Sequence, residues 1–279
     1  MQIRPHHITW GALIVSAAGA IFGVYFLLAY IVAPLFWRHY EHQHELAGAS
    51  MLTRTAAGIP GDPINVGLVG SRADVLCAMN AASWYPADPI TLRSSAEIAG
   101  SVLLDRPYRD APVSHLYYDN RRQDLAFEKP VGNSADRRHH VRFWRVLERG
   151  EEGRAVWLGA ATFDIGVGFS HDDARITHHI APDIDADRNL LITDLAAAKV
   201  VTTIYEITGI GPTVNGRNGE GDRYYTDGEI KISVLVDGCD QRAKSFAVLD
   251  NPPLVAAKNL AWDTIARNLL SASVPSPKR

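Results

Sequence analysis

Histidines and carboxylates whose chemistry could define a site gather in the middle of the sequence. Two adjacent histidines occupy 139–140 and two more occupy 178–179, with Asp164 between the pairs. Two imidazoles and one carboxylate form a known ligand set for zinc or iron. If the protein binds a metal, the predicted ligands are therefore His140, Asp164 and His178. The residues by themselves assign no cofactor.

Adjacent histidines on an extended chain cannot both serve one site. Both pairs lie in segments that predict strands, and successive side chains of a strand point to opposite faces. At most one histidine of each pair therefore faces a common cleft. The alternative interpretation is structural, with these side chains hydrogen-bonding strand ends and forming ordinary ion pairs. The other polar candidates for a site are Arg142, Arg122, Asp124, His179 and Asp183.

The sequence lacks the motifs that would make an enzymatic interpretation strong. It contains neither the HExxH of zinc hydrolases nor the GxSxG of serine hydrolases. The glycine-rich stretch over 209–228 lacks GxxxxGK[ST], so we predict a long hairpin loop and not a phosphate-binding loop. The aspartates over 183–187 resemble the start of an EF-hand, but Arg188 stands where that loop needs glycine. We predict instead that Asp183 or Asp185 caps a helix.

Composition restricts the class of protein. The formal net charge is -3, and the basic residues are spread along the chain, which argues against a nucleic-acid-binding protein. Of the two cysteines, Cys77 is predicted to be a small buried residue on a helix, and Cys239 lies in a turn-like segment. A disulfide between them is the alternative, which requires an exported domain.

The strongest signal in the sequence is an uncharged stretch near the N-terminus. No Asp, Glu, Lys or Arg occurs from Ile8 to Trp37. A bilayer core needs about 20 apolar helical residues, so we predict one retained transmembrane helix and a single-pass protein of the cell membrane. The alternative is a signal peptide cleaved after Ala20, but its apolar region would be only about 7–15 residues long. A short tail before one anchor favours a periplasmic or other extracytoplasmic position for the domain.

Hydrophobic periodicity predicts an α+β fold, with one mixed, largely antiparallel sheet and several packing helices behind the N-terminal transmembrane helix. Capping boxes at Ser71-x-x-Asp74 and Ser94-x-x-Glu97 predict two helix starts. We expect a hairpin whose strands lie in SHLYYD and DLAFE, joined by the turn NRRQ. The other predicted strands lie over 64–70, 139–147, 156–163, 175–180, 199–207 and 229–236, and the other helices follow Pro182 and Pro253.

Several blocks of the sequence closely resemble the LssY C-terminal domain family. They include INVGLVG, WYPADPITLRSS, VWLGAATFD and ITHHIAPDIDADRNLL, and the resemblance runs from about Pro63 to about Val236. It implies a bacterial membrane-associated protein. In that family the domain can follow a membrane segment that resembles PAP2-type lipid phosphatases. No catalytic residues are established for the domain itself, and this chain lacks the KxxxxxxRP and SGH motifs of the phosphatases.

The sequence thus predicts four parts: a tail and transmembrane helix over 1–37, a juxtamembrane linker over 38–62, an LssY C-terminal-like domain over 63–270 and a disordered tail over 271–279. The leading functional hypothesis is a membrane-anchored bacterial envelope protein whose domain is a binding or accessory module. Its expected partners are the bilayer and a protein or lipid head group, and not nucleic acid. The alternative is a metal-dependent hydrolase that acts on a phosphorylated or lipid-linked substrate at the membrane.

Overall fold

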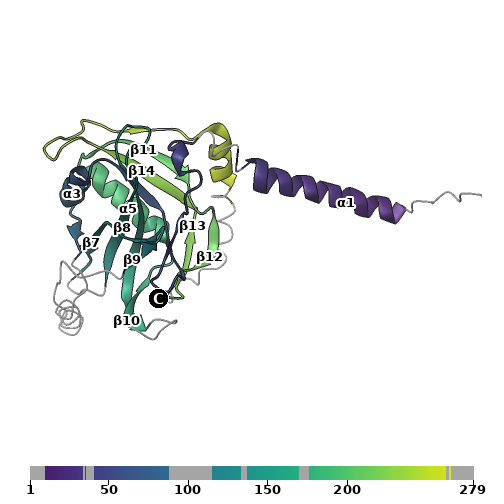
Figure 1. Cartoon of the computed structure of the whole chain (residues 1–279), viewed down its shortest axis with the longest axis horizontal. Coiled ribbons are helices and arrows are strands. Elements are labelled where there is room, and N and C mark those ends of the chain that lie inside the picture. Colours follow the sequence, from purple (N-terminus) through teal and green to yellow (C-terminus); the bar gives the residue numbers. More distant parts are fainter. Residues whose placement is uncertain are drawn as a thin grey trace, which may run out of the picture.

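The N-terminal part of the chain is an apolar helix that extends away from the folded domain (Figure 1). Helix α1 spans Trp10–Leu27 and continues as a π-helical turn, η1, over Leu28–Val32. The segment Leu13–Val32 is long and apolar enough to cross a membrane, and none of it is buried against the domain. The computed structural model describes residues 10–33, 35, 41–87, 115–132, 137–169, 176–261 and 264.

A mixed, mostly antiparallel sheet organises the domain and confirms the predicted α+β class. Its strands run in the order β15-β11-β14-β3-β9-β8-β7-β4, and β10 pairs with β9. Only the β14–β3 and β11–β15 pairs are parallel. The strands are β3 Val66–Val69, β4 Tyr85–Pro86, β7 Leu125–Pro130, β8 Arg138–Leu147, β9 Val156–Phe169, β10 Ile176–Ile180, β11 Val201–Thr208, β14 Glu229–Leu235 and β15 Ala247–Val248.

Both faces of this sheet are covered, which explains why alternate side chains of one strand enter different cores. Helices α3, Arg72–Ala81, and α5, Ile184–Ala197, pack on the face that carries Val141 and Phe143. The opposite face carries Trp144 and is covered by N-terminal segments and a small second sheet. That second sheet contains β1 Leu52–Arg54, β2 Pro60–Pro63, β5 Tyr117–Tyr118 and β6 Arg121–Arg122.

Local capping signals position the two helices as predicted. Ser71 and Asp74 form a complete capping box at the start of α3. Asp183 caps α5, because its carboxylate accepts a hydrogen bond from the backbone N–H of Ala186 at 3.1 Å. These caps satisfy backbone donors that a helix leaves unpaired at its first turn. The second predicted capping box, at Ser94 and Glu97, lies outside the described residues.

The predicted hairpin is wrong in its pairing. Asp119 and Asn120 both have positive φ angles, of 48° and 59°, and form a two-residue turn between β5 and β6. Two such left-handed residues match the twist of a tight hairpin, so the chain reverses before the expected turn. Strand β7, which contains DLAFE, then pairs with β8 in the main sheet.

The segment expected to be a linker over 38–62 is folded onto the domain in its described part, 41–62. Glu41 and Gln43 are buried, and Leu46, at the end of the 3₁₀ turn His44–Leu46, enters the core. The turn is followed by β1 and β2. The ordered unit therefore begins before Pro63, because short polar strands of this kind are held by their neighbours and carry no periodic signal of their own.

The glycine-rich stretch also forms ordered structure. Strand β12, Thr213–Arg217, pairs with β13, Arg223–Thr226, to make a two-stranded hairpin. Glycine satisfies the positive φ at Gly221, in the loop between these strands. The C-terminal helix predicted after Pro252 is present over 253–261, whereas the expected tail over 271–279 lies outside the described residues.

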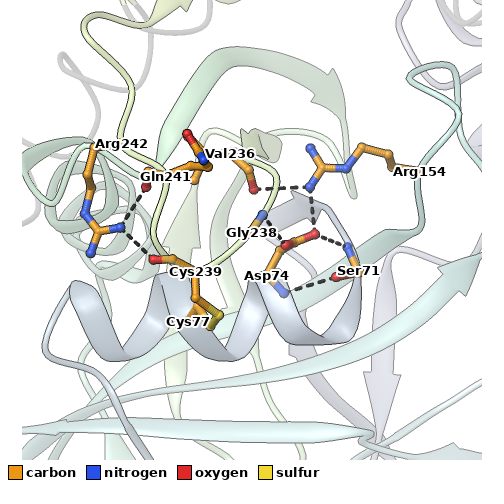
Figure 2. Close-up of a disulfide and its surroundings, with 9 residues drawn as sticks. All are labelled: Ser71, Asp74, Cys77, Arg154, Val236, Gly238, Cys239, Gln241 and Arg242. Carbon is orange, nitrogen blue, oxygen red and sulfur yellow. Dashed lines mark hydrogen bonds and ion pairs between the residues drawn. A yellow bond between two sulfur atoms is a disulfide. The ribbon is translucent and has the colours of Figure 1, made fainter.

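A disulfide ties α3 to the turn that follows β14 (Figure 2). Cys77 and Cys239 are 162 residues apart in sequence, with Cα atoms 5.2 Å apart. Asp74 reinforces the junction, since its carboxylate accepts from the Gly238 N–H at 2.9 Å and from Arg154 at 2.8 Å. The expectation that Cys77 is simply a buried thiol is wrong, and the alternative pairing is the one observed.

Candidate functional site

A small cavity between the main sheet and the N-terminal segments collects most of the buried charge near the predicted histidines. We call it the polar cavity. Its volume is about 40 Å³, which is room for a few water molecules or one small polar group. It is lined by Thr55, Gly61, Asp62, Leu116, Arg138, His140, Arg142, Asp164, His178, Ile180, Asn218, Gly219 and Glu220.

Three of these lining residues come from strand β8, because alternate side chains of a strand point to the same face. Arg138, His140 and Arg142 are spaced two residues apart on β8, so they share one face. Asp164 on β9 lies opposite Arg138 in the antiparallel register. His178 comes from β10, the strand that pairs with the end of β9. Three neighbouring strands therefore present their polar side chains to the same space.

Arg138 is held by two buried carboxylates. Its Nη1 lies 2.7 Å from Glu128 Oε2 and its Nε lies 3.0 Å from Asp164 Oδ2. Burial alone would raise the pKa of Asp164, but its interactions with His140, which include a hydrogen bond, and with Arg138 and His178 hold it well below its ordinary value. The carboxylate is thus kept ionised inside the protein, and this network is a fixed element of the site.

His140 is engaged at both ring nitrogens. Its Nδ1 lies 3.1 Å from Asp164 Oδ1, and its Nε2 lies 2.8 Å from Arg142 Nη1 and 2.9 Å from the Thr162 hydroxyl. A guanidinium can only donate, so Nε2 accepts from Arg142, and the ring proton is on Nδ1, facing Asp164. Thr162 does not line the cavity. A nucleophilic role for that hydroxyl is therefore unsupported.

The structure supports the predicted metal site only in part. His140, Asp164 and His178, the three predicted ligands, do line the same cavity. Within the described part of the chain, however, no group of three or more histidine, cysteine or acidic side chains is arranged to hold a metal ion. The two guanidinium groups beside these residues would also repel a cation.

Arg142 is a second buried cation that lines the cavity. Its Nη1 lies 3.5 Å from Asp62 Oδ2, a distance longer than a normal charge-assisted hydrogen bond. Burial lowers the pKa of Arg142, and the nearby Asp62 and Asp164 carboxylates do not fully offset it. Asp62 itself accepts from Asn218 Nδ2 at 3.1 Å. An anionic oxygen in the cavity would stabilise this guanidinium.

The histidine pairs divide between the two faces, as the alternation predicts. His140 and His178 line the polar cavity, whereas His139 Nδ1 lies 2.5 Å from Asp187 and His179 Nδ1 lies 2.7 Å from Asp222. The opposite orientation of neighbours in a strand is therefore confirmed for 139–140, and of the second pair His178 alone lines the cavity.

The structure brings together four of the eight predicted site residues. These four are His140, Arg142, Asp164 and His178, and the other four do not line the cavity. His179 binds Asp222, and Asp183 caps α5. Asp124 accepts from the backbone N–H of Arg145 at 2.8 Å, and Arg122 is exposed on β6.

Sequence reasoning missed Arg138, Asp62 and Asn218. Arg138 could have been found, because it precedes His140 by two residues and must share its face. Asp62 and Asn218 carry no local signal. They lie in a short strand and in a hairpin loop, 156 residues apart, and only the folded chain places them in contact.

Fold and site together define an α+β domain with a partly open, charge-lined cavity, and an apolar helix that could span a membrane precedes the domain. Residues 44–230 match the family model described as LssY C-terminus. The chain therefore belongs to the LssY C-terminal domain family, and the match starts within the N-terminal segment that folds onto the domain. No curated protein and no solved structure matches the chain.

Proposed function

We propose that this protein is a single-pass, membrane-anchored bacterial envelope protein whose domain binds an anionic group in the polar cavity. The observation that carries the proposal is the position of Arg142. This guanidinium is buried and lines the cavity, and burial lowers its pKa even though the Asp62 and Asp164 carboxylates lie nearby. The chemistry expected of the ligand is a phosphate or carboxylate oxygen, presented by a lipid head group or by a partner protein.

The two guanidinium groups that line the cavity, Arg138 and Arg142, support an anion over a cation. The carboxylates of Asp62 and Glu220 in the same lining would oppose an anion. Asp164 and Glu128 are both engaged by Arg138, so these carboxylates are not arranged around an open cation position. Arg142 and His178 line the space that remains, and both side chains carry N–H groups of the kind that bind an anionic oxygen. The small volume of the cavity restricts the ligand to one group of this kind, with the rest of the partner outside.

The disulfide supports an extracytoplasmic domain. Disulfides persist in oxidising compartments and are rare in the cytosol, where thiols are kept reduced. Cys77 and Cys239 are the only cysteines in the chain, and they are paired. An exported domain behind the Leu13–Val32 helix would place the polar cavity in the envelope, within reach of lipid head groups.

Ligand-dependent stabilisation tests the binding proposal. The melting temperature of the full chain in neutral detergent would be measured against inorganic phosphate, acetate and short-chain phosphatidic acid, with chloride at equal ionic strength. At about tenfold excess over Kd, a ligand that binds only the folded state adds about 1.4 kcal/mol. Arg142→Gln should remove the increase, whereas Arg121→Gln, at an exposed arginine outside the cavity, should retain it.

The outcomes separate the sources of the anion. An increase with phosphatidic acid above that with phosphate favours a lipid head group, and an increase with acetate alone favours a carboxylate of a partner protein. No ligand-dependent increase, or the same increase in Arg142→Gln, would refute anion binding at this cavity.

A metal-dependent hydrolase is the second candidate function, favoured by the convergence of His140, Asp164 and His178 on one cavity. Elemental analysis of the purified full chain tests it directly. Stoichiometric zinc or iron that is lost in both His140→Ala and His178→Ala would support the hydrolase and would contradict the proposal that the domain is a binding module. A chain without stoichiometric metal, together with unchanged phosphatase activity in both variants, would remove this candidate.

A further inference from the structure

The C-terminal helix over 253–261 has its polarity reversed relative to an ordinary surface helix. Its exposed positions are all occupied by apolar residues. Leu254 and Leu260 are 45% and 66% exposed. A surface helix of a soluble domain normally turns its apolar stripe toward the core and its charges toward water. The exposed residues are Pro253, Leu254, Ala256, Ala257, Leu260 and Ala261.

The charged residue of this helix faces inward. The Lys258 side chain is only 19% exposed, and its ammonium group pairs with the buried carboxylate of Glu229 on β14. It also donates to the Thr208 hydroxyl at 3.4 Å. Val255, three residues earlier and so about one helical turn away, is also buried, at 1% exposed. This ion pair fixes the rotation of the helix, and the apolar stripe is therefore held outward by interactions within the domain.

The position of the helix indicates what covers the stripe. Glu41 accepts a hydrogen bond from the backbone N–H of Thr208 at 3.2 Å, so the chain that follows the anchor reaches the same residue as Lys258. Glu41 follows Trp37, the end of the uncharged stretch, by only four positions, which span at most about 14 Å. Figure 1 shows the C-terminal helix, in yellow, at the corner of the domain from which α1 extends.

We infer that the exposed apolar face of the helix over 253–261 docks on the surface of the bilayer into which α1 inserts. The inference rests on the proposed membrane anchoring and goes beyond it. An apolar stripe held within a short distance of lipid is buried most readily in the interfacial region of the membrane. The domain then has two attachments, and its orientation relative to the bilayer is restricted.

Fluorescence quenching in vesicles tests this docking. The full chain would be reconstituted in vesicles of phosphatidylethanolamine and phosphatidylglycerol, with a new cysteine at Leu260→Cys or Leu254→Cys carrying an environment-sensitive dye. The native cysteines are paired, so the new thiol is labelled selectively. The matched control is Val131→Cys, at a 37% exposed apolar residue directly after β7, and Figure 1 shows β7 on the side of the domain away from α1.

Docking predicts that nitroxides on lipid acyl chains quench the dye at 260 and that aqueous iodide does not, with the reverse at 131. Iodide quenching at 260 as strong as at 131 would overturn the inference. So would shielding from iodide without quenching by lipid nitroxides, because a second copy or another segment would then cover the stripe. Extraction with alkaline carbonate is carried out before the dyes are measured. Release of the chain from the vesicles at that step would show that the proposed membrane anchoring is wrong, which is a different result from a failure of docking.

Discussion

Removal of the charge on Asp164 should destabilise the domain strongly, because Asp164 is the carboxylate that joins Arg138 to His140. The side chain is 1% exposed, and it lies 3.0 Å from Arg138 Nε and 3.1 Å from His140 Nδ1. Breaking a buried ion pair by removing one partner costs about 3–5 kcal/mol. Arg138 retains Glu128 in Asp164→Asn, so we expect about 3 kcal/mol, near the lower end of that range.

For a domain of this size, such a loss lowers the melting temperature by about 6–12 °C. Circular dichroism of the full chain in detergent at neutral pH measures it. The matched control is Glu148→Gln, which removes an exposed carboxylate 3.0 Å from Arg145 on the same strand as Arg138, and it should leave the melting temperature essentially unchanged.

Acidification provides a second readout of the same interaction. The pKa of Asp164 is lower in the folded state than its ordinary value of 3.8, so its stabilisation is present above that pH and is lost as the pH falls. Wild type and Asp164→Asn should therefore converge in melting temperature at low pH. A difference of less than about 2 °C at neutral pH would refute the reasoning, since it would show that the ion pair contributes little.

Three further predictions concern the ion pair of the C-terminal helix, the disulfide and membrane sidedness. Burial, only partly offset by Lys258, raises the pKa of Glu229 from 4.5 to about 7, so stability should fall by roughly 3 kcal/mol as the pH rises through that interval. This component of the pH-dependence of urea unfolding should be absent in Glu229→Gln, and its persistence there would contradict the assignment. Replacing Cys77 and Cys239 by serine should cost about 2–5 kcal/mol in the same assay, because the bridge closes a long loop, and unchanged unfolding would argue against the pairing. Protease added to intact spheroplasts should digest the domain, whereas digestion only after lysis would place it in the cytoplasm.

Much of the architecture could be predicted because the responsible interactions are local. The box formed by Ser71 and Asp74 and the cap at Asp183 depend on residues within one helical turn. The division of each histidine pair between two faces depends only on the geometry of an extended strand. These features are present in a few consecutive residues, and the folded chain reproduces them.

The failures share a different cause. The small hairpin between β5 and β6 reverses at Asp119 and Asn120, and β7 then joins a different sheet, which no short window of sequence specifies. The segment over 41–62 lacks periodicity because its side chains are buried by distant strands and not by one another. Cys77 and Cys239 pair across 162 residues, and their spacing alone left the bond undecided.

The sequence by itself determined the apolar helix, the α+β class, the family and the face of β8 on which Arg138, His140 and Arg142 lie, because composition and strand alternation act over short distances. Only the tertiary structure decided that this face meets Asp62 and Asn218 around one cavity. Sheet register and strand order set that convergence, and they depend on contacts between residues far apart in the chain. The buried guanidinium of Arg142, on which the proposed function rests, is a product of that convergence.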